Sequence, residues 1–130
     1  MTNRHSFGQL CAQVCAQQGW EILPGGVGVT LPSGRRQVVT LEFFEDQEEL
    51  VRLATGIGSA QGMPSERLSL ALQINARLAH GALAVRDGEL VMIDTLMLQD
   101  ADAAEIEASI RYLADTADYY EKTIFGTDQY

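Results

Sequence analysis

The sequence predicts an α+β fold with the element order α-β-β-β-α-β-β-α, in which an antiparallel sheet is flanked by helices. Three observations support this prediction. Apolar residues recur with helical spacing in the first, middle and last segments, and runs rich in β-branched and aromatic residues lie between them. An Asp-Gly pair joins two of these apolar runs, which is the strongest local signal of a hairpin. Groups of strands separated by helices, without a repeated βαβ pattern, indicate an antiparallel α+β protein.

The first predicted helix carries apolar side chains at positions i, i+3, i+4, i+7 and i+8, which lie on one helical face. Ser6 is the expected N-cap and Gly19 the expected end. The only two cysteines lie on this face, four residues apart. Helical geometry would separate their Cβ atoms by about 5–6 Å, against ~3.8 Å in a disulfide, so we expect reduced core thiols. The face consists of Phe7, Leu10, Cys11, Val14 and Cys15.

Three strands are expected after this helix. The first covers residues 21–31, with a Pro-Gly-Gly interruption at 24–26 that fits a bulge or an edge position. The second, central strand covers residues 36–45 and is rich in Val, Thr and Phe. An acidic turn leads to the third, residues 50–57, where apolar and small residues alternate with others. Residues 48–54 also fit the start of a helix, so this third assignment has an alternative.

The second predicted helix begins near Pro64, which suits a first turn, and ends at Gly81. Leu70 and Ile74 give it a second apolar side, so we expect it to be buried widely, in part against a second subunit. Asn75 lies on its main stripe and has two interpretations, a contact to a client or second subunit, or an internal amide that ties helix to strand. The second is favoured, because buried polar groups are usually paired internally. The stripe consists of Leu68, Ala71, Leu72, Asn75, Leu78 and Ala79.

The hairpin follows, with strands at residues 82–86 and 89–98. Alternation places Asp94 on the apolar face of the second strand, so it faces the core or a dimer contact and needs a partner if buried. The last helix begins at Asp102, which forms a capping-box pattern with Glu105, and ends at Gly126. Its apolar stripe consists of Ile106, Ile110, Leu113, Ala117, Tyr120 and Ile124.

Composition limits the classes of function. The 130 residues fit one domain, residues 1–130, and 46% of them are hydrophobic, enough for an ordinary core. The net charge of −9 repels phosphate, which disfavours nucleic acid and anionic membrane surfaces as partners. No apolar run approaches the ~20 residues of a membrane span, and the first twenty residues lack a signal-peptide pattern. We therefore expect a cytoplasmic protein.

No residue pattern indicates catalysis, a metal or a cofactor. The two histidines, His5 and His80, lack ligand spacing, and the glycines at 25–28 lack the lysine and the following helix of a phosphate loop. Asp94 and Thr95 suggest acid–base chemistry, but no second carboxylate or histidine has a spacing that places it nearby. A structural hydrogen bond is the favoured interpretation of Asp94.

Two stretches, with the order of elements, resemble a known class of proteins. LSLALQINARLAHGALAVRDGELVMIDTLML, residues 68–98, combines a Leu-rich helix containing an Asn, a Gly-containing exit and a hairpin; DAAEIEASIRYLADTADYYEK matches a closing helix. Both are similar to type III secretion chaperones and to the YbjN-like family, often called putative sensory-transduction regulators. The resemblance implies a secretion-chaperone-like domain that forms a homodimer, binds an effector or regulator as its client, and has no catalytic activity.

The resemblance also implies where a client would bind, because apolar grooves of the sheet and first helix receive an extended segment in the chaperone class. By position, the client-binding candidates are Phe7, Leu10 and Val14 on the first helix and Val38, Thr40 and Phe43 on the central strand. The dimer-interface candidates are Leu70, Ile74, Met92 and Asp94. Two other functions stay open: a YbjN-like regulatory or stress-response protein that binds a signalling partner, and a small hydrolase or ligand-binding enzyme. The enzyme would require a pocket that joins Asp94, Thr95 or His80.

Overall fold

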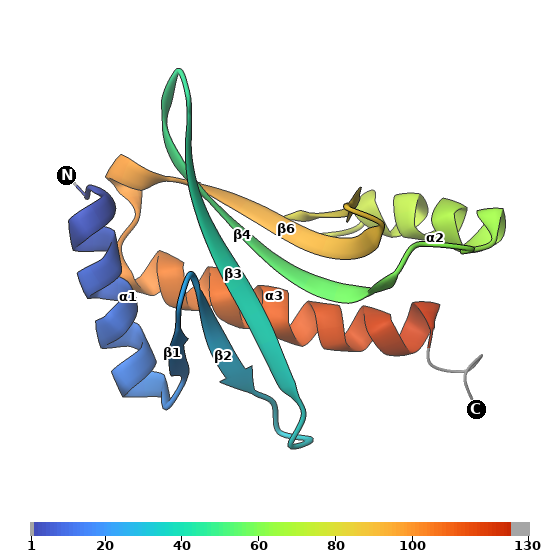
Figure 1. Cartoon of the computed structure of the whole chain (residues 1–130), viewed down its shortest axis with the longest axis horizontal. Helices are drawn as coiled ribbons and strands as arrows, with labels where there is room; N and C mark the ends of the chain where they lie inside the picture. The colour runs from blue at the N-terminus through green and yellow to red at the C-terminus, as the bar shows by residue number, and fades with distance from the viewer. Residues whose placement is uncertain (1, 126–130) are drawn as a thin grey trace.

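The computed structural model describes residues 2–125 and confirms the predicted α+β fold class. Six antiparallel strands form one sheet, and helices flank it (Figure 1). In chain order the elements are α1 (Arg4–Gln18), β1 (Glu21–Leu23), β2 (Gly26–Thr30), β3 (Arg36–Asp46), β4 (Glu48–Ser59), α2 (Ser65–Asn75), β5 (Ala82–Arg86), β6 (Glu89–Met97), the 3-10 turn η1 (Leu98–Asp100) and α3 (Ala103–Ile124).

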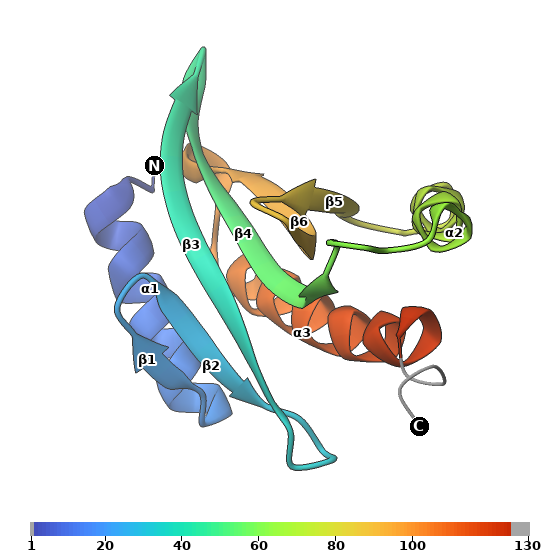
Figure 2. The same cartoon turned by 45° about the vertical axis from the view of Figure 1, so that its right-hand side comes forward.

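The strands are ordered β1-β2-β3-β4-β6-β5 across the sheet. Each of the hairpins β1–β2, β2–β3, β3–β4 and β5–β6 pairs consecutive strands, and β6 returns after α2 to pair with β4. A register shift between Gly56 and Gly58 interrupts the long β4–β6 pairing. The sheet is strongly twisted, and the tip of the β3–β4 hairpin projects beyond it (Figure 2).

The helices lie on one face of the sheet. Helix α3 packs across β3, β4 and β6, α1 packs against α3 and β1, and α2 packs on β5 and touches α3. In Figure 1 the strands β2, β3 and β4 pass in front of α3. Burial alternates along β3 accordingly: Val39 is buried beneath the helices, whereas Val38 is 40% exposed. We call these two sides the helix-covered face and the helix-free face.

The core lies between the helix-covered face and the helices. Residues from all three helices and from strands β2 to β6 meet in it. The largest fully buried side chains include Phe7, Leu53, Ile74, Leu90, Met92, Leu98, Ile106, Ile110 and Leu113. Five of the six stripe residues predicted for α3 are buried, and Tyr120 is half-buried, so its helical spacing correctly identified the side that meets the sheet.

Two predicted strands have different bounds in the structure. Residues 21–31 form a hairpin of two short strands, not one interrupted strand. The chain reverses at Pro24-Gly25, where Gly25 adopts a positive φ of 68° that glycine tolerates without strain. The proposed strand at residues 50–57 is confirmed and is longer, Glu48–Ser59; the helical alternative for residues 48–54 is wrong, because each of them is paired with β3.

The helix ends differ in detail from the predictions. The N-cap of α1 is Asn3, and Ser6 is its partner in a reciprocal capping box. Helix α2 ends at Asn75 instead of Gly81, so Leu78 and Ala79 of its predicted stripe lie in the following loop. Leu72 belongs to the helix but is 71% exposed. The expected end of α3 at Gly126 lies outside the described residues.

The amide of Asn75 explains where α2 meets the sheet. Its Oδ1 accepts from the backbone N–H of Leu83 (2.6 Å), and its Nδ2 donates to the Leu83 carbonyl (3.1 Å). Both backbone groups of one β5 residue are thereby satisfied by the last residue of the helix. The interpretation of Asn75 as an internal tie between helix and strand is confirmed.

Candidate functional site

An apolar groove lies between α1, the β1–β2 hairpin and β3. We call it the α1 groove; its volume is about 240 Å³. Its walls come from α1, from the β1–β2 hairpin at the edge of the sheet, and from alternate residues of β3 on the helix-covered face. The lining residues are Arg4, Phe7, Gly8, Cys11, Ala12, Ile22, Leu23, Gly25, Gly26, Val27, Leu41 and Phe43.

Two phenylalanines from distant parts of the chain join the walls of this groove. Phe7 of α1 and Phe43 of β3 meet edge to face, with ring centroids 5.6 Å apart and an interplanar angle of 89°. This is a favoured geometry for aromatic pairs. The guanidinium of Arg4 lies 5.5 Å from the centroid of the Phe43 ring. On the opposite wall Ile22 is 62% exposed, so the groove offers accessible apolar surface at its rim.

The two thiols of α1, Cys11 in the groove lining and Cys15 in the core, carry no charge at neutral pH. Burial, reinforced by the proximity of Cys15, raises the pKa of Cys11 from 9.0 to about 12. Burial also raises the pKa of Cys15. A protonated thiol is a poor nucleophile and a poor metal ligand. Both cysteines are buried in the core, as expected, and Cys11 also lines the groove.

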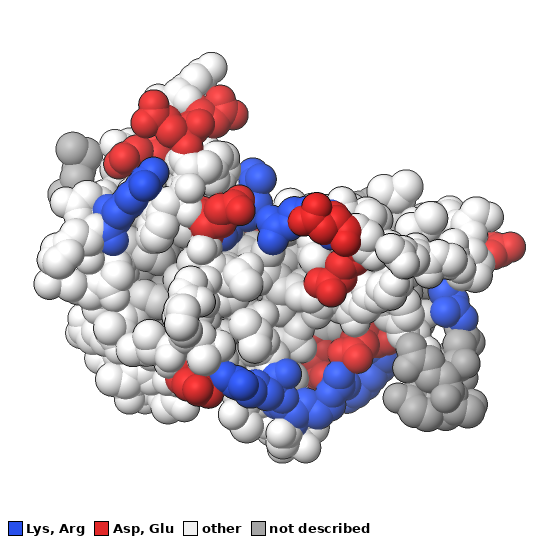
Figure 3. Space-filling view, in the orientation of Figure 1, with Lys and Arg blue, Asp and Glu red and all other residues white. Residues whose placement is uncertain are grey.

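A second groove, the sheet-face groove, lies on the helix-free face and has a volume of about 230 Å³. It is lined by Val38, Thr40, Ala54, Thr55, Gly56, Arg86, Glu89 and Val91. Figure 3 looks onto this side of the molecule: an uncharged area occupies the middle, and acidic and basic side chains lie above and below it. The red cluster at the top of the view belongs to the acidic β3–β4 hairpin.

The structure separates the predicted client-binding residues into three environments. Phe7 and Phe43 come together in the α1 groove. Val38 and Thr40 lie on the other side of the sheet, in the sheet-face groove, because they alternate with the inward residues of β3. Val14 is 1% exposed, inside the core, and Leu10 is half-buried against it; neither lines the α1 groove.

The predicted dimer-interface residues also lie in different places. Ile74 and Met92 are 1% and 0% exposed, so both side chains are already enclosed within one chain. Leu70 is half-buried on α2, packed against the core. Asp94 is half-buried and lines a third cavity. Only Leu70 and Asp94 of this set therefore present accessible surface.

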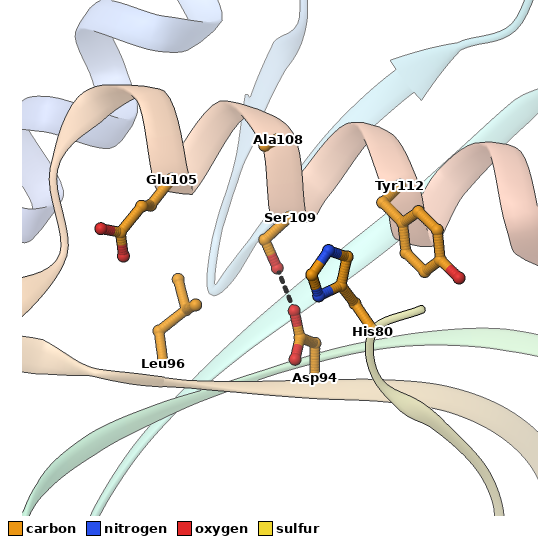
Figure 4. A pocket seen from close by; sticks show the side chains of 7 residues that line it. All are labelled: His80, Asp94, Leu96, Glu105, Ala108, Ser109 and Tyr112. Atoms are coloured by element: carbon orange, nitrogen blue, oxygen red, sulfur yellow. Dashed lines mark hydrogen bonds between the residues drawn. The ribbon is translucent and has the colours of Figure 1, made fainter. Parts of the chain in front are cut away.

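The third cavity, which we call the Asp94 pocket, lies between β6, α3 and the loop before β5 and has a volume of about 230 Å³ (Figure 4). Ser109 donates to Asp94 Oδ2 (2.8 Å), and Asp94 Oδ1 accepts from the backbone N–H of Thr95 (3.0 Å). Asp94 thus forms the structural hydrogen bond that the sequence predicts. The lining residues are His80, Asp94, Leu96, Glu105, Ala108, Ser109 and Tyr112.

This pocket joins two residues, His80 and Asp94, that the enzyme hypothesis required together. The serine hydroxyl donates to the carboxylate, however, and the imidazole meets the ring of Tyr112 edge to face, with centroids 5.5 Å apart. Within residues 2–125 no hydrogen bond joins His80 to Ser109, so the contact between nucleophile and base is not formed. Thr95 faces the opposite side of the sheet, where its hydroxyl accepts from Arg52 Nε (3.3 Å).

Some lining residues were not identified from the sequence. The signal for Ser109 was its place inside the apolar stripe of α3, directly before Ile110. The signal for Leu41 was its alternation with Val39 and Phe43 on β3. Ile22 gave no such signal, because it belongs to a three-residue strand.

Neither a metal-binding cluster nor a membrane-spanning helix is found among the described residues. No group of three or more histidine, cysteine, aspartate or glutamate side chains there is arranged to bind a metal ion. None of the helices described is long and apolar enough to cross a membrane.

Comparison with known proteins gives one family and several solved structures. The family model YbjN, described as a putative bacterial sensory transduction regulator, matches residues 10–125. Comparison with curated proteins gives no match. A chain in the crystal structure of the ExsC–ExsE complex superposes with a TM-score of 0.72 at 14% identity, covering 95% of this chain and 97% of that one.

Two other solved structures share the fold. One is a chain of the HopA1–SchA chaperone–effector complex, with a TM-score of 0.64, 11% identity and coverage of 89% of this chain and 93% of that one. The other comes from the crystal structure of the Yersinia pestis type III secretion chaperone SycH in complex with a stable fragment of YscM2. Its TM-score is 0.58 at 17% identity, with 87% of this chain and 98% of that one covered. The predicted resemblance to secretion chaperones is therefore confirmed at the level of the fold.

Proposed function

The chain belongs to the YbjN family of putative bacterial sensory transduction regulators, and from that premise we propose that it is a cytoplasmic, non-enzymatic protein-binding module that masks an apolar segment of a client protein. The observation that carries the proposal is the α1 groove, whose walls are almost entirely apolar and whose rim is exposed at Ile22. The solved complexes of the same fold, one of them a chaperone–effector complex, support it.

The groove fits an extended apolar segment better than a polar ligand. Leu23, Leu41 and the Phe7–Phe43 pair supply apolar surface, and Cys11 adds a neutral thiol. Removing such surface from water stabilises a complex by about 25 cal/mol per Å² before the entropic cost of association. β1 lies at the edge of the sheet beside the groove, so an extended segment has backbone groups available for strand addition as well as side-chain contacts.

A homodimer is the second part of the proposal. The helix-free face exposes Val38 in the sheet-face groove, and Leu70 and Asp94 are the accessible members of the predicted interface. Light scattering coupled to gel filtration tests this directly. We expect a mass twice that of the 14.2 kDa chain, and a mass near 14.2 kDa would contradict the dimer.

Substitution of the groove rim tests client binding. We expect Ile22→Glu to abolish capture of the proteins that co-purify with the wild-type chain from its native host, because a carboxylate would then be buried against the bound segment. Leu72→Glu is the matched control, since Leu72 is 71% exposed on α2 and does not line the α1 groove. Equal capture by both variants and the wild type, read by mass spectrometry, would refute the masking role of the groove.

A regulatory protein that binds a signalling partner is the second candidate, and the family description favours it. The same groove would serve it, so the geometry does not separate the two functions. The identity of the captured protein does: an effector supports the chaperone role, and a component of a signalling pathway supports the regulator.

A further inference from the structure

We propose that the Asp94 pocket receives an arginine side chain of the protein partner. The inference rests on the proposed function, because it requires a protein that binds this chain. It concerns a different cavity from the α1 groove: the pocket lies between α3 and β6, and His80 is among its lining residues (Figure 4).

The charges of the pocket select a cation. Two carboxylates, those of Asp94 and Glu105, line it, and no lysine or arginine is among its lining residues. Asp94 is half-buried, and within the described part of the chain it accepts hydrogen bonds from Ser109 and from the Thr95 backbone but forms no ion pair. A partly buried carboxylate whose donors are all neutral gains Coulombic attraction from an added cationic donor, and partial burial strengthens that attraction relative to bulk water.

The remaining walls fit the rest of an arginine side chain. Leu96 and Ala108 offer apolar contact for its methylene stem, and the rings of His80 and Tyr112 offer flat surfaces at the other side of the pocket. In Figure 4 Glu105 and Tyr112 project from α3 on either side of Asp94, so Glu105 lies toward one end of the pocket and the rings of His80 and Tyr112 lie toward the other. A planar guanidinium stacks on aromatic rings and bridges two carboxylates, which an ammonium does less well.

The long-range field favours the same occupant. The chain carries 18 acidic and 9 basic residues, so a cationic segment is attracted before it makes contact. Inside the pocket, partial burial reduces screening by salt, whereas attraction to the exposed acidic surface falls as salt rises. Binding that survives physiological salt and is confined to the pocket therefore differs from non-specific attraction.

The test uses the full chain labelled with ¹⁵N and the blocked peptide acetyl-Ala-Arg-Ala-amide at physiological salt. We expect saturable shifts of the amide resonances of Asp94, Ser109 and Tyr112, and no such shifts with the isosteric peptide in which neutral citrulline replaces arginine. Asp94→Asn keeps an acceptor for Ser109 and should weaken binding about tenfold, the loss of one charged hydrogen bond. Glu105→Gln is a second variant that keeps the α3 backbone cap, and exposed Asp115→Asn on α3 is the control that should change nothing.

Three results would overturn the inference: equal shifts with the citrulline peptide, shifts spread over the acidic surface instead of the pocket, or unchanged affinity in both Asp94→Asn and Glu105→Gln. A parallel titration with acetyl-Leu-Phe-Leu-amide separates this inference from the proposed function. Shifts at Ile22 and Phe43 with that peptide, without arginine binding in the pocket, would refute the pocket alone. Arginine binding without any response of the α1 groove would refute the masking role and leave the pocket standing.

Discussion

The two faces of the sheet use similar residues for different purposes. On β3 the neighbours Val38 and Val39 are the same residue type, yet Val39 is fully buried under the helices and Val38 is 40% exposed on the helix-free face. The alternation of a strand therefore determines which residues share a face but not which face acquires a cover. The stability of the fold should therefore depend mainly on residues of the helix-covered face. Interaction with other chains should depend on the helix-free face and on the open cavities.

The largest expected effect is the difference in the free energy of unfolding between two truncating substitutions, one on each face. Leu53→Ala, at a fully buried position of β4 on the helix-covered face, should lower the free energy of unfolding by about 2–5 kcal/mol. Val38→Ala should lower it by less than about 0.5 kcal/mol, as for most exposed substitutions. Urea unfolding of both variants measures the difference. Similar losses would mean that the helix-free face is also a folding core.

Two glycines sharpen the comparison within the helix-free face. A Cβ on Gly26 would lie 2.8 Å from the backbone carbonyl oxygen of Val39, which cannot move without disturbing the sheet. A Cβ on Gly56 would meet only the flexible carboxylate of Glu89, at 2.6 Å. Gly26→Ala should therefore cost about 1–3 kcal/mol of stability, and Gly56→Ala clearly less. Thermal unfolding of the two variants measures both costs. Equal costs would mean that the contact with the Val39 carbonyl oxygen is not the source of the strain.

Alkaline pH should destabilise the core beneath α1 through the two buried thiols of that helix. Because burial raises the pKa of Cys11 to about 12, the folded chain keeps a proton that the unfolded chain loses above pH 9.0. The free energy of unfolding should therefore fall as pH rises above 9, by about 1.4 kcal/mol between pH 8 and pH 10. Cys11→Ala should reduce this slope, and the comparison of slopes in urea unfolding is the measurement. Identical slopes would show that other groups control the alkaline loss.

The smallest effect is expected at the charged rim of the helix-free face. Arg36 and Glu21 form an ion pair (2.6 Å) with both side chains about half exposed or more. Glu21→Gln should change stability by about 0–1 kcal/mol, and the change should shrink in high salt. A larger, salt-independent loss would indicate that this pair helps to define the β1–β2 hairpin.

The regular parts of the fold could be predicted because each carries a local signal. The spacing of Ile106, Ile110 and Leu113 identified the buried side of α3, and Asp87-Gly88 identified the β5–β6 turn. The end of α2 could not be found this way, because Asn75 ends it through hydrogen bonds to Leu83, eight residues later. The β1–β2 hairpin was missed for a similar reason: three residues are too few to show alternation.

The candidate sites were less predictable, because cavities form where separate elements meet. Phe7 and Phe43 were identified as one site, and their contact joins residues that no local pattern relates. Val38 and Thr40 were assigned to the same site, but alternation on β3 directs them to the other face. Asp94 was recognised as a polar residue among apolar ones, yet its neighbours Ser109 and Glu105 come from a helix whose position depends on the whole sheet.

Helix α3 has a consequence for how the molecule is made. It supplies Ile106, Ile110 and Leu113 to the core, and all six strands precede it in the chain. During synthesis the inner face of the sheet therefore emerges before the helix that covers it. At about 5–20 residues per second, a ribosome needs roughly 1–5 s to add the 22 residues of α3. For that interval a nascent strand array is without its main cover, and the acidic β3–β4 tip, which repels neighbouring nascent chains, is already present to oppose aggregation.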